Sequence, residues 1–151
     1  MGQHKFLWAC LIGLSAFFVS TQLFAQADVI EKRQKLMKGQ SAAAKAIKGA
    51  VEAKDYTTIE TKAKELMGSS EKISDHFPKG STAGKTKAKA EIWDKWDDYG
   101  QKAKNLRKAA SELADAAKSG DGAAVDVKVK ALSAACKGCH EPFRAEKYSG
   151  E

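Results

Sequence analysis

The chain has 151 residues, of which 43% are hydrophobic, with 26 Lys and Arg, 19 Asp and Glu, three Cys and two Pro. This length suits one compact domain, because a domain usually takes roughly 100–200 residues. It excludes a chain of several independent domains, and the formal charge of +7 indicates a basic protein.

The N-terminus is predicted to be a signal peptide. His4 and Lys5 precede the apolar region 6–19, and the small-x-small cleavage pattern is at 25–27. We expect residues 1–27 to be removed, together with Cys10, and the mature protein to reside in the periplasm. The alternative is an uncleaved membrane anchor, but the apolar stretch falls short of the roughly 20 residues that span a bilayer.

The predicted mature domain, residues 28–151, contains 124 residues with 25 basic and 19 acidic side chains. A domain of this size buries a modest core and often needs a staple such as a metal or cofactor. Only Cys136 and Cys139 remain in it, and a disulfide between them would close a loop too short to constrain much of the unfolded chain. We therefore expect these two Cys to serve another purpose.

Good helix formers dominate the mature chain, and short breaks rich in Gly, Pro and Ser divide it. Apolar residues recur at helical spacing in four segments, which are 28–53, 55–77, 84–119 and 121–143. Residues 125–129 alternate as a strand would, but a single strand would have no partner. We predict an all-α, antiparallel up-down-up-down four-helix bundle. Pro142 should kink the last helix or end it early.

Residues 136–140 form the sequence Cys-Lys-Gly-Cys-His, the attachment motif for c-type haem. On one face of a helix, Cys residues three apart can each reach a vinyl group of the porphyrin, and the adjacent His lies under the iron. We predict one covalent haem c with thioether bonds at Cys136 and Cys139 and with His140 as the proximal iron ligand. Because covalent attachment occurs outside the cytoplasm, the motif and the export signal support each other.

Three other interpretations of the two Cys are weaker. A zinc site needs about four ligands, whereas the mature chain has only two Cys and two His. A thioredoxin-like redox pair expects a βαβ context, which the helical pattern lacks. A structural disulfide is disfavoured by its short loop.

Haem attachment near the C-terminus of a four-helix chain resembles the cytochrome c-prime family, the class II c-type cytochromes. Mitochondrial-like cytochromes attach haem near the N-terminus instead. The resemblance covers nearly the whole mature chain and is carried by residues 30–38 (IEKRQKLMK), 77–93 (FPKGSTAGKTKAKAEIW) and 136–147 (CKGCHEPFRAEK). The last segment is the most specific.

The resemblance implies a distal iron ligand. In that family the residue four positions after an Arg in the first helix faces the distal side of the haem; it is bulky and apolar in most members and Met in a low-spin branch. Met37 follows Arg33 at this spacing. In an antiparallel bundle, at about 1.5 Å per residue, Met37 and His140 also lie at the same level. Met67 is the rival ligand, and ordinary core packing is the alternative role for Met37.

Further contacts to the cofactor follow from the resemblance. It places Arg33 near a haem propionate, where a guanidinium can form a charge-assisted pair, with a solvated surface Arg as the alternative. Trp93 and Phe143 are expected to pack on the porphyrin, and Arg144 to lie near the proximal side of His140. His76 is expected to be a solvent-facing or capping side chain.

An iron held by Met and His in an apolar core has no open position for substrate, and such ligation raises the reduction potential. We therefore predict a periplasmic one-electron carrier and not an enzyme. The alternative is a five-coordinate-type haem protein that binds nitric oxide or carbon monoxide, and a third possibility is a bundle without haem.

The excess positive charge predicts redox partners with acidic docking surfaces, because complementary fields speed encounter; ordinary solvated helix faces rich in Lys are the alternative explanation. Nucleic acid is not expected as a partner, because export separates the chain from it, and no stable membrane insertion is expected after signal cleavage. Members of the family often form homodimers through their first two helices. The basic residues expected at the haem end are Lys32, Lys35, Lys38, Lys137, Arg144 and Lys147.

Overall fold

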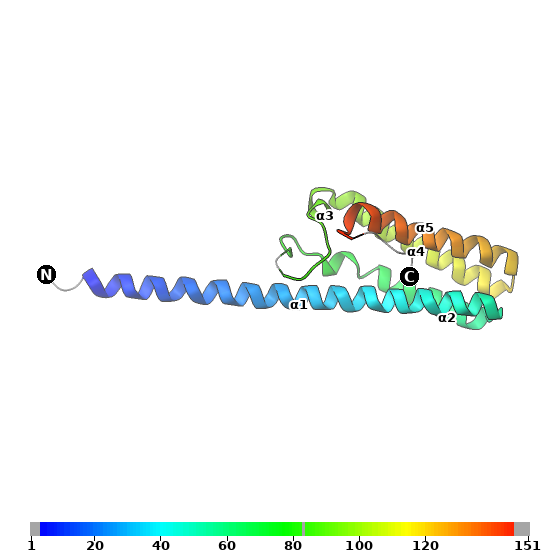
Figure 1. Cartoon of the computed structure of the whole chain (residues 1–151), viewed down its shortest axis with the longest axis horizontal. Coiled ribbons are helices and arrows are strands. Elements are labelled where there is room, and N and C mark those ends of the chain that lie inside the picture. Colours follow the sequence, from blue (N-terminus) through cyan, green and yellow to red (C-terminus); the bar gives the residue numbers. More distant parts are fainter. Residues whose placement is uncertain (1–3, 83, 147–151) are drawn as a thin grey trace.

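Four long helices lie side by side and run in alternating directions (Figure 1). They are α1 (His4–Ala53), α2 (Tyr56–Ser70), α4 (Trp96–Ser119) and α5 (Gly122–Phe143). The connection from α2 to α4 contains the 3-10 helix η1 (Ser74–His76) and the short helix α3 (Glu91–Asp94). The computed structural model describes residues 4–82 and 84–146, and the side chains of 27–82 and 84–146. The predicted all-α antiparallel four-helix bundle is confirmed.

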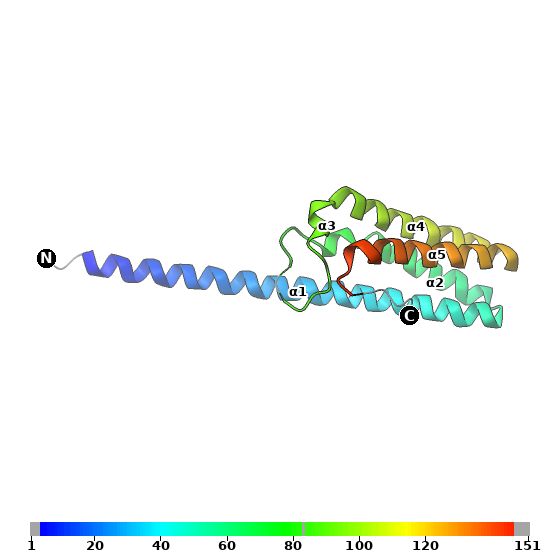
Figure 2. The ribbon, with the colours of Figure 1, turned by 45° about the horizontal axis from the view of Figure 1, so that its top comes forward.

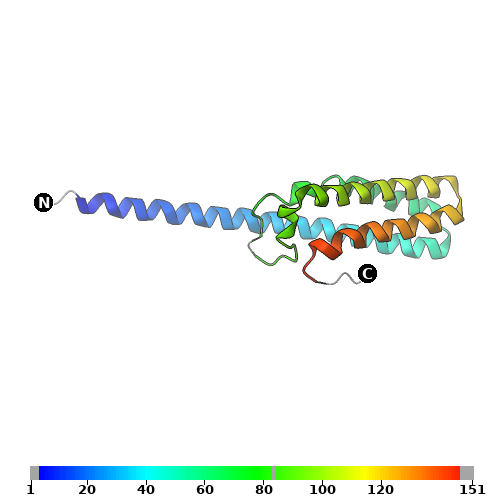
Figure 3. The same cartoon turned by 90° about the horizontal axis from the view of Figure 1, so that it is seen from above.

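The N-terminal half of α1 extends well beyond the other helices (Figures 1 and 3). The predicted signal peptide falls on this extension, and the side chains of residues 1–26 lie outside the described residues. Cleavage at 25–27 therefore stays a prediction. In the part of the chain that the structure describes, no helix is both long enough and apolar enough to cross a membrane.

Acidic caps begin two of the helices. The carboxylate of Asp55 accepts a hydrogen bond from the Thr58 backbone N–H at 3.0 Å, and Asp121 accepts one from Ala124 N–H at 3.0 Å. Such caps pair backbone donors that the first helical turn leaves unsatisfied. Gly120 ends α4 in the left-handed conformation with φ 70°, which a residue without a Cβ adopts at little cost. The predicted breaks at 54–55 and 119–122 are thereby confirmed.

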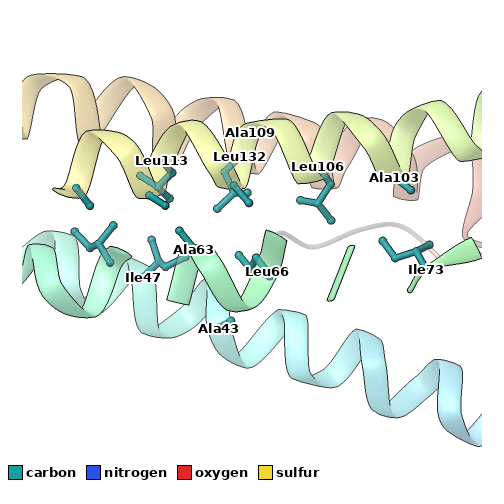
Figure 4. Packing of buried hydrophobic residues seen from close by; sticks show 14 of the residues in the cluster. Ala43, Ile47, Ala63, Leu66, Ile73, Ala103, Leu106, Ala109, Leu113 and Leu132 are labelled. Carbon is teal, nitrogen blue, oxygen red and sulfur yellow. The ribbon is translucent and has the colours of Figure 1, made fainter. Parts of the chain in front are cut away.

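The core lies between three pairs of packed helices. Helix α1 packs on α2, α2 packs on α4, and α4 packs on α5. Figure 4 shows side chains of α4 facing side chains of α1 and α2 across this core. The largest side chains that are less than 2% exposed are Ile47, Ile59, Leu66, Ile92, Leu113 and Val125. Large apolar side chains of this kind each stabilise the fold by about 1.5–3 kcal/mol when fully buried.

One predicted core stripe differs from the structure. On α1 the buried residues are Ile30, Arg33, Ala43, Ile47 and Ala50, whereas Met37 and Ala44, which follow Ile30 at the heptad spacing predicted for the core, are only half-buried. The physical reason is that α1 has two inward faces. One packs on α2, and the other, which carries Met37 and Ala44, borders a cavity.

The connection between α2 and α4 also departs from the helical pattern (Figure 2). The second helix ends at Ser70 and not at Phe77, although Phe77 remains buried. The third was predicted to begin at residue 84, but α3 begins at Glu91. Backbone groups of residues 87–89 pair instead with the end of α5, since Lys89 N–H donates to the Phe143 carbonyl at 3.1 Å. This tertiary pairing replaces helical hydrogen bonds.

The same pairing fixes the end of α5. Pro142 lies in its final turn, the helix ends at Phe143, and Arg144 is extended. Ala145 N–H donates to the Lys87 carbonyl at 2.8 Å. The predicted early end of the last helix is confirmed, and it brings residues 143–146 against residues 87–89.

Candidate haem-binding site

A cavity of about 710 Å³ lies between α1, α4, α5 and the connection 71–90. This volume is within the range of roughly 300–1,000 Å³ that small-molecule and cofactor sites occupy. Its apolar wall consists of Met37, Ala44, Leu66, Ile73, Phe77, Ala88, Ile92, Tyr99, Ala103, Leu106, Ala135 and Phe143. Its polar and charged lining includes Arg33, Lys38, Lys85, Lys87, Lys102, Arg144 and Glu146.

The haem-attachment motif occupies one wall of the cavity. Cys136, Cys139 and His140 lie near the end of α5, each half-buried, and all three line the cavity. Because Cys136 and Cys139 are three residues apart on one helix, their thiols share a face. The structure therefore brings together the three residues that the motif predicts as cofactor anchors.

Burial sets the protonation of these groups. It raises the pKa of the Cys136 thiol, and it raises the pKa of Cys139, with a contribution from Cys136, to about 11. Burial also lowers the pKa of His140, and the positive charge of Arg144 adds to this effect. A neutral imidazole is the form that ligates metals. The two Cys are not joined by a disulfide, and the described residues contain no cluster of three or more His, Cys, Asp or Glu that could hold a metal ion.

The two candidate distal ligands are placed differently. Met37, on α1, lines the same cavity as His140 on the opposite helix α5. Met67 packs against the hydrophobic core and is not among the cavity-lining residues. The structure thus brings Met37 and His140 to one site and leaves Met67 outside it. Ligation of iron by Met37 stays a prediction.

Arg33 is buried, with 4% of its surface exposed. The alternative prediction of a solvated surface Arg at this position is therefore wrong. Its Nε donates to the His76 carbonyl at 3.0 Å, and both terminal nitrogens donate to the Ser81 carbonyl. The Ser81 hydroxyl at 2.6 Å and the Thr86 hydroxyl at 3.2 Å accept the remaining hydrogen bonds. The guanidinium carbon also lies 4.0 Å from the centre of the Phe77 ring.

These hydrogen bonds join α1 to the connection 71–90, which forms one wall of the cavity. We call this set of contacts the Arg33 latch. Burial lowers the pKa of Arg33 and Tyr99 raises it, but a guanidinium stays charged at neutral pH. All five of its N–H groups point at protein acceptors. The pairing of Arg33 with a propionate stays a prediction. These hydrogen bonds were not predicted from the sequence, because the partners Ser81 and Thr86 carry no sequence pattern that links them to Arg33.

The other predicted contact residues divide between the cavity and its surroundings. Phe143 is buried and, with Arg144, lines the cavity. Trp93 is not among the lining residues; its indole Nε1 donates to the carbonyls of Phe77 and Pro78, at 3.1 and 3.0 Å. Trp93 therefore packs beside the cavity, because α3 ends at Asp94 and breaks the helical register.

The structure also gives the contacts of His76 and the locations of the basic residues that were predicted at the haem end. His76 Nδ1 lies 2.7 Å from the Lys72 carbonyl, which fits the predicted capping role. Lys32 pairs with Asp28 at 2.7 Å and Lys137 with Glu141 at 3.5 Å. Of the remaining basic residues, Lys38 and Arg144 line the cavity, Lys35 lies on the outer side of α1 and α2, and Lys147 lies outside the described residues.

The lining fits a haem c. Cys136 and Cys139 would hold the porphyrin through thioether bonds, and His140 would ligate the iron, while the apolar wall suits the macrocycle. The Tyr99 hydroxyl adds a further indication, since it is buried in the cavity wall without a hydrogen-bond partner among the described residues. The bound group would supply an iron that exchanges single electrons.

Comparisons with known proteins agree with this site. The cytochrome c' family model matches residues 28–144. The chain is 43% identical over 86 residues to cytochrome c' of Rhodospirillum rubrum, a match that spans 56% of this chain and 58% of that protein. It is 32% identical over 124 residues to cytochrome c-556 of Agrobacterium fabrum, spanning 80% of this chain and 84% of the relative.

The fold is similar to solved structures of the same family. Cytochrome c prime from Shewanella frigidimarina superposes with a TM-score of 0.74 at 28% identity, covering 80% of this chain and 97% of that one. The matched family model spans most of the chain and includes the attachment motif. The chain therefore belongs to the cytochrome c' family, whose members are c-type haem proteins with covalently bound haem c.

Proposed function

We propose that this protein is a periplasmic one-electron carrier and not an enzyme, with a low-spin haem iron held by His140 and Met37. The observation that carries the proposal is that these two side chains line one cavity from the facing helices α5 and α1. Met37 would supply a thioether and His140 an imidazole to the iron, so both protein ligands would be in place without a substrate. Such ligation raises the reduction potential and leaves no open position for a substrate.

The surroundings of the two ligands support a carrier. Met37 lies one helical turn after Arg33, and the Arg33 latch holds α1 against the connection 71–90. His140 lies on α5, which packs along α4. A site built on packed helices is held in place by its neighbours, so a change of oxidation state requires little rearrangement.

Partners and location belong to the same proposal. Lys38, Lys85 and Lys102 line the cavity, and basic side chains around a redox centre favour redox partners with acidic docking surfaces. Export to the periplasm is supported by the apolar N-terminal segment and by the haem-attachment motif. A homodimer through α1 and α2 also stays part of the proposal.

The test compares Met37→Leu with Met67→Leu. The first change replaces the proposed sulfur ligand with an apolar side chain of similar volume, so the ferric iron should change from low-spin to high-spin and the reduction potential should fall. Met67→Leu should leave both properties unchanged, since Met67 does not line the cavity. Absorption spectroscopy and a redox titration provide the measurements. A low-spin spectrum that survives Met37→Leu would exclude Met37 as the ligand.

A further inference from the structure

Tyr99 is a buried tyrosine in the cavity wall whose hydroxyl has no assigned role. It lies in the first turn of α4 and is 2% exposed. The centroid of its ring lies 5.0 Å from that of Phe77 and 5.3 Å from that of Phe143. The Phe143 ring meets it edge-on, with an angle of 89° between the two ring planes. These neighbours fix the direction of the phenol ring, so the position of its hydroxyl is defined by packing.

The Tyr99 hydroxyl has no hydrogen-bond partner among the described residues. Leaving a buried hydroxyl unpaired costs about 1–3 kcal/mol, so such groups usually have a partner. The neighbouring buried polar groups of Arg33 and Ser81 are paired with each other. Tyr99 also lines the cavity, so a group that fills the cavity can supply the missing partner.

Tyr99 is suited to donate a hydrogen bond. Burial raises the pKa of its hydroxyl far above the ordinary value, and Arg33 opposes the shift. The phenol thus keeps its proton at any physiological pH. An acceptor on the group that fills the cavity would complete the bonding of this oxygen.

Haem offers few such acceptors. Its macrocycle is largely apolar, its four pyrrole nitrogens bind the iron, and its two propionate carboxylates are the strong acceptors. A carboxylate inside a protein needs hydrogen-bond donors. The Arg33 guanidinium already donates to His76, Ser81 and Thr86, so a second donor in the cavity wall suits the carboxylates.

We propose that the Tyr99 hydroxyl donates a hydrogen bond to a propionate carboxylate of the haem and thereby helps to set its reduction potential. The inference rests on haem occupying the cavity and does not depend on Met37. A negative propionate favours ferric iron, and a hydrogen bond disperses part of that charge. Tyr99 therefore shifts the equilibrium toward the ferrous state.

The test is Tyr99→Phe, which removes one oxygen and keeps the ring packing. The matched control is Tyr56→Phe. Tyr56 begins α2, and its hydroxyl lies 2.7 Å from where a Cβ would stand on Gly122, at the end of the bundle far from the attachment motif. Resonance Raman spectra of both oxidation states report the propionate bending bands, a redox titration reports the potential, and circular dichroism checks the fold.

Tyr99→Phe should shift the propionate bands and lower the potential, while Tyr56→Phe should match the wild type in both. Propionate bands that stay unchanged in a folded Tyr99→Phe variant would overturn the proposal. If the potential of that variant is also unchanged, the hydroxyl meets only water.

Discussion

Replacing both Cys136 and Cys139 with Ser is expected to abolish covalent haem attachment. Each thioether bond requires a thiol, and a Ser hydroxyl does not provide one. Only non-covalent contacts, with His140 and Met37 as the proposed iron ligands, would then hold the haem, and acidified organic solvent would extract it. The pyridine haemochrome assay on the precipitated protein should find no bound haem, against one per chain in the wild type.

The same double variant should be much less stable. Where the non-covalently held haem dissociates, the apolar side chains that wall the cavity, such as Ile73, Phe77 and Leu106, lose their partner. At about 1.5–3 kcal/mol for each large apolar side chain, a loss of at least ~3 kcal/mol is expected. That corresponds to a melting temperature lower by roughly 10 °C for a domain of this size.

Cys10→Ser is the matched control for the loss of a thiol. Cys10 lies in the predicted signal peptide, so this variant should retain covalent haem and the wild-type melting temperature. Covalent haem in the Cys136→Ser, Cys139→Ser protein would contradict the assignment of these residues as the anchors.

Arg33→Lys should destabilise the protein by about 3 kcal/mol, because hydrogen bonds to charged groups contribute roughly 1.5–3 kcal/mol each and are not additive. The variant keeps the charge but loses the planar fork that reaches three separate partners. The carbonyls of His76 and Ser81, which accept from Arg33 at 3.0 to 3.4 Å, would lose their donor. Urea unfolding of the haem-loaded protein measures this change.

Arg107→Lys is the control for the same chemical change at the surface. Arg107 pairs with Glu71 at 2.7 Å, and both side chains are more than half exposed, so its replacement should cost less than about 1 kcal/mol. Trypsin should also cleave the connection 71–90 faster in Arg33→Lys than in the wild type. Equal stability and equal cleavage in the two variants would show that Arg33 is not a latch.

The fold could be predicted where local chemistry decides the structure. Asp55 and Asp121 begin helices because their carboxylates accept backbone N–H groups two or three residues later, and Gly120 ends one. The spacing of Ile59, Leu66 and other apolar residues predicted the buried faces of α2 and α4. Residues 84–90 could not be predicted, since backbone groups of Lys87 and Lys89 pair with Ala145 and Phe143, which are far away in the sequence.

In the site, too, residues whose role depends on local spacing could be predicted, and residues whose role depends on tertiary contacts could not. Cys136, Cys139 and His140 could be found because the chemistry of haem attachment fixes their spacing within one helix. Met37 was found by resemblance, since core packing explains a lone Met on an apolar stripe equally well. The role of Arg33 and the unpaired hydroxyl of Tyr99 depend on burial and on partners from other segments, which no spacing encodes.

The closed coordination of the iron is tested most directly by adding carbon monoxide to the reduced wild-type protein. Because His140 and Met37 are proposed to fill both axial positions, the ferrous absorption spectrum should stay unchanged. Rapid and tight binding, seen as the spectrum of a carbonyl complex, would contradict the proposed carrier and support a gas-binding haem protein instead.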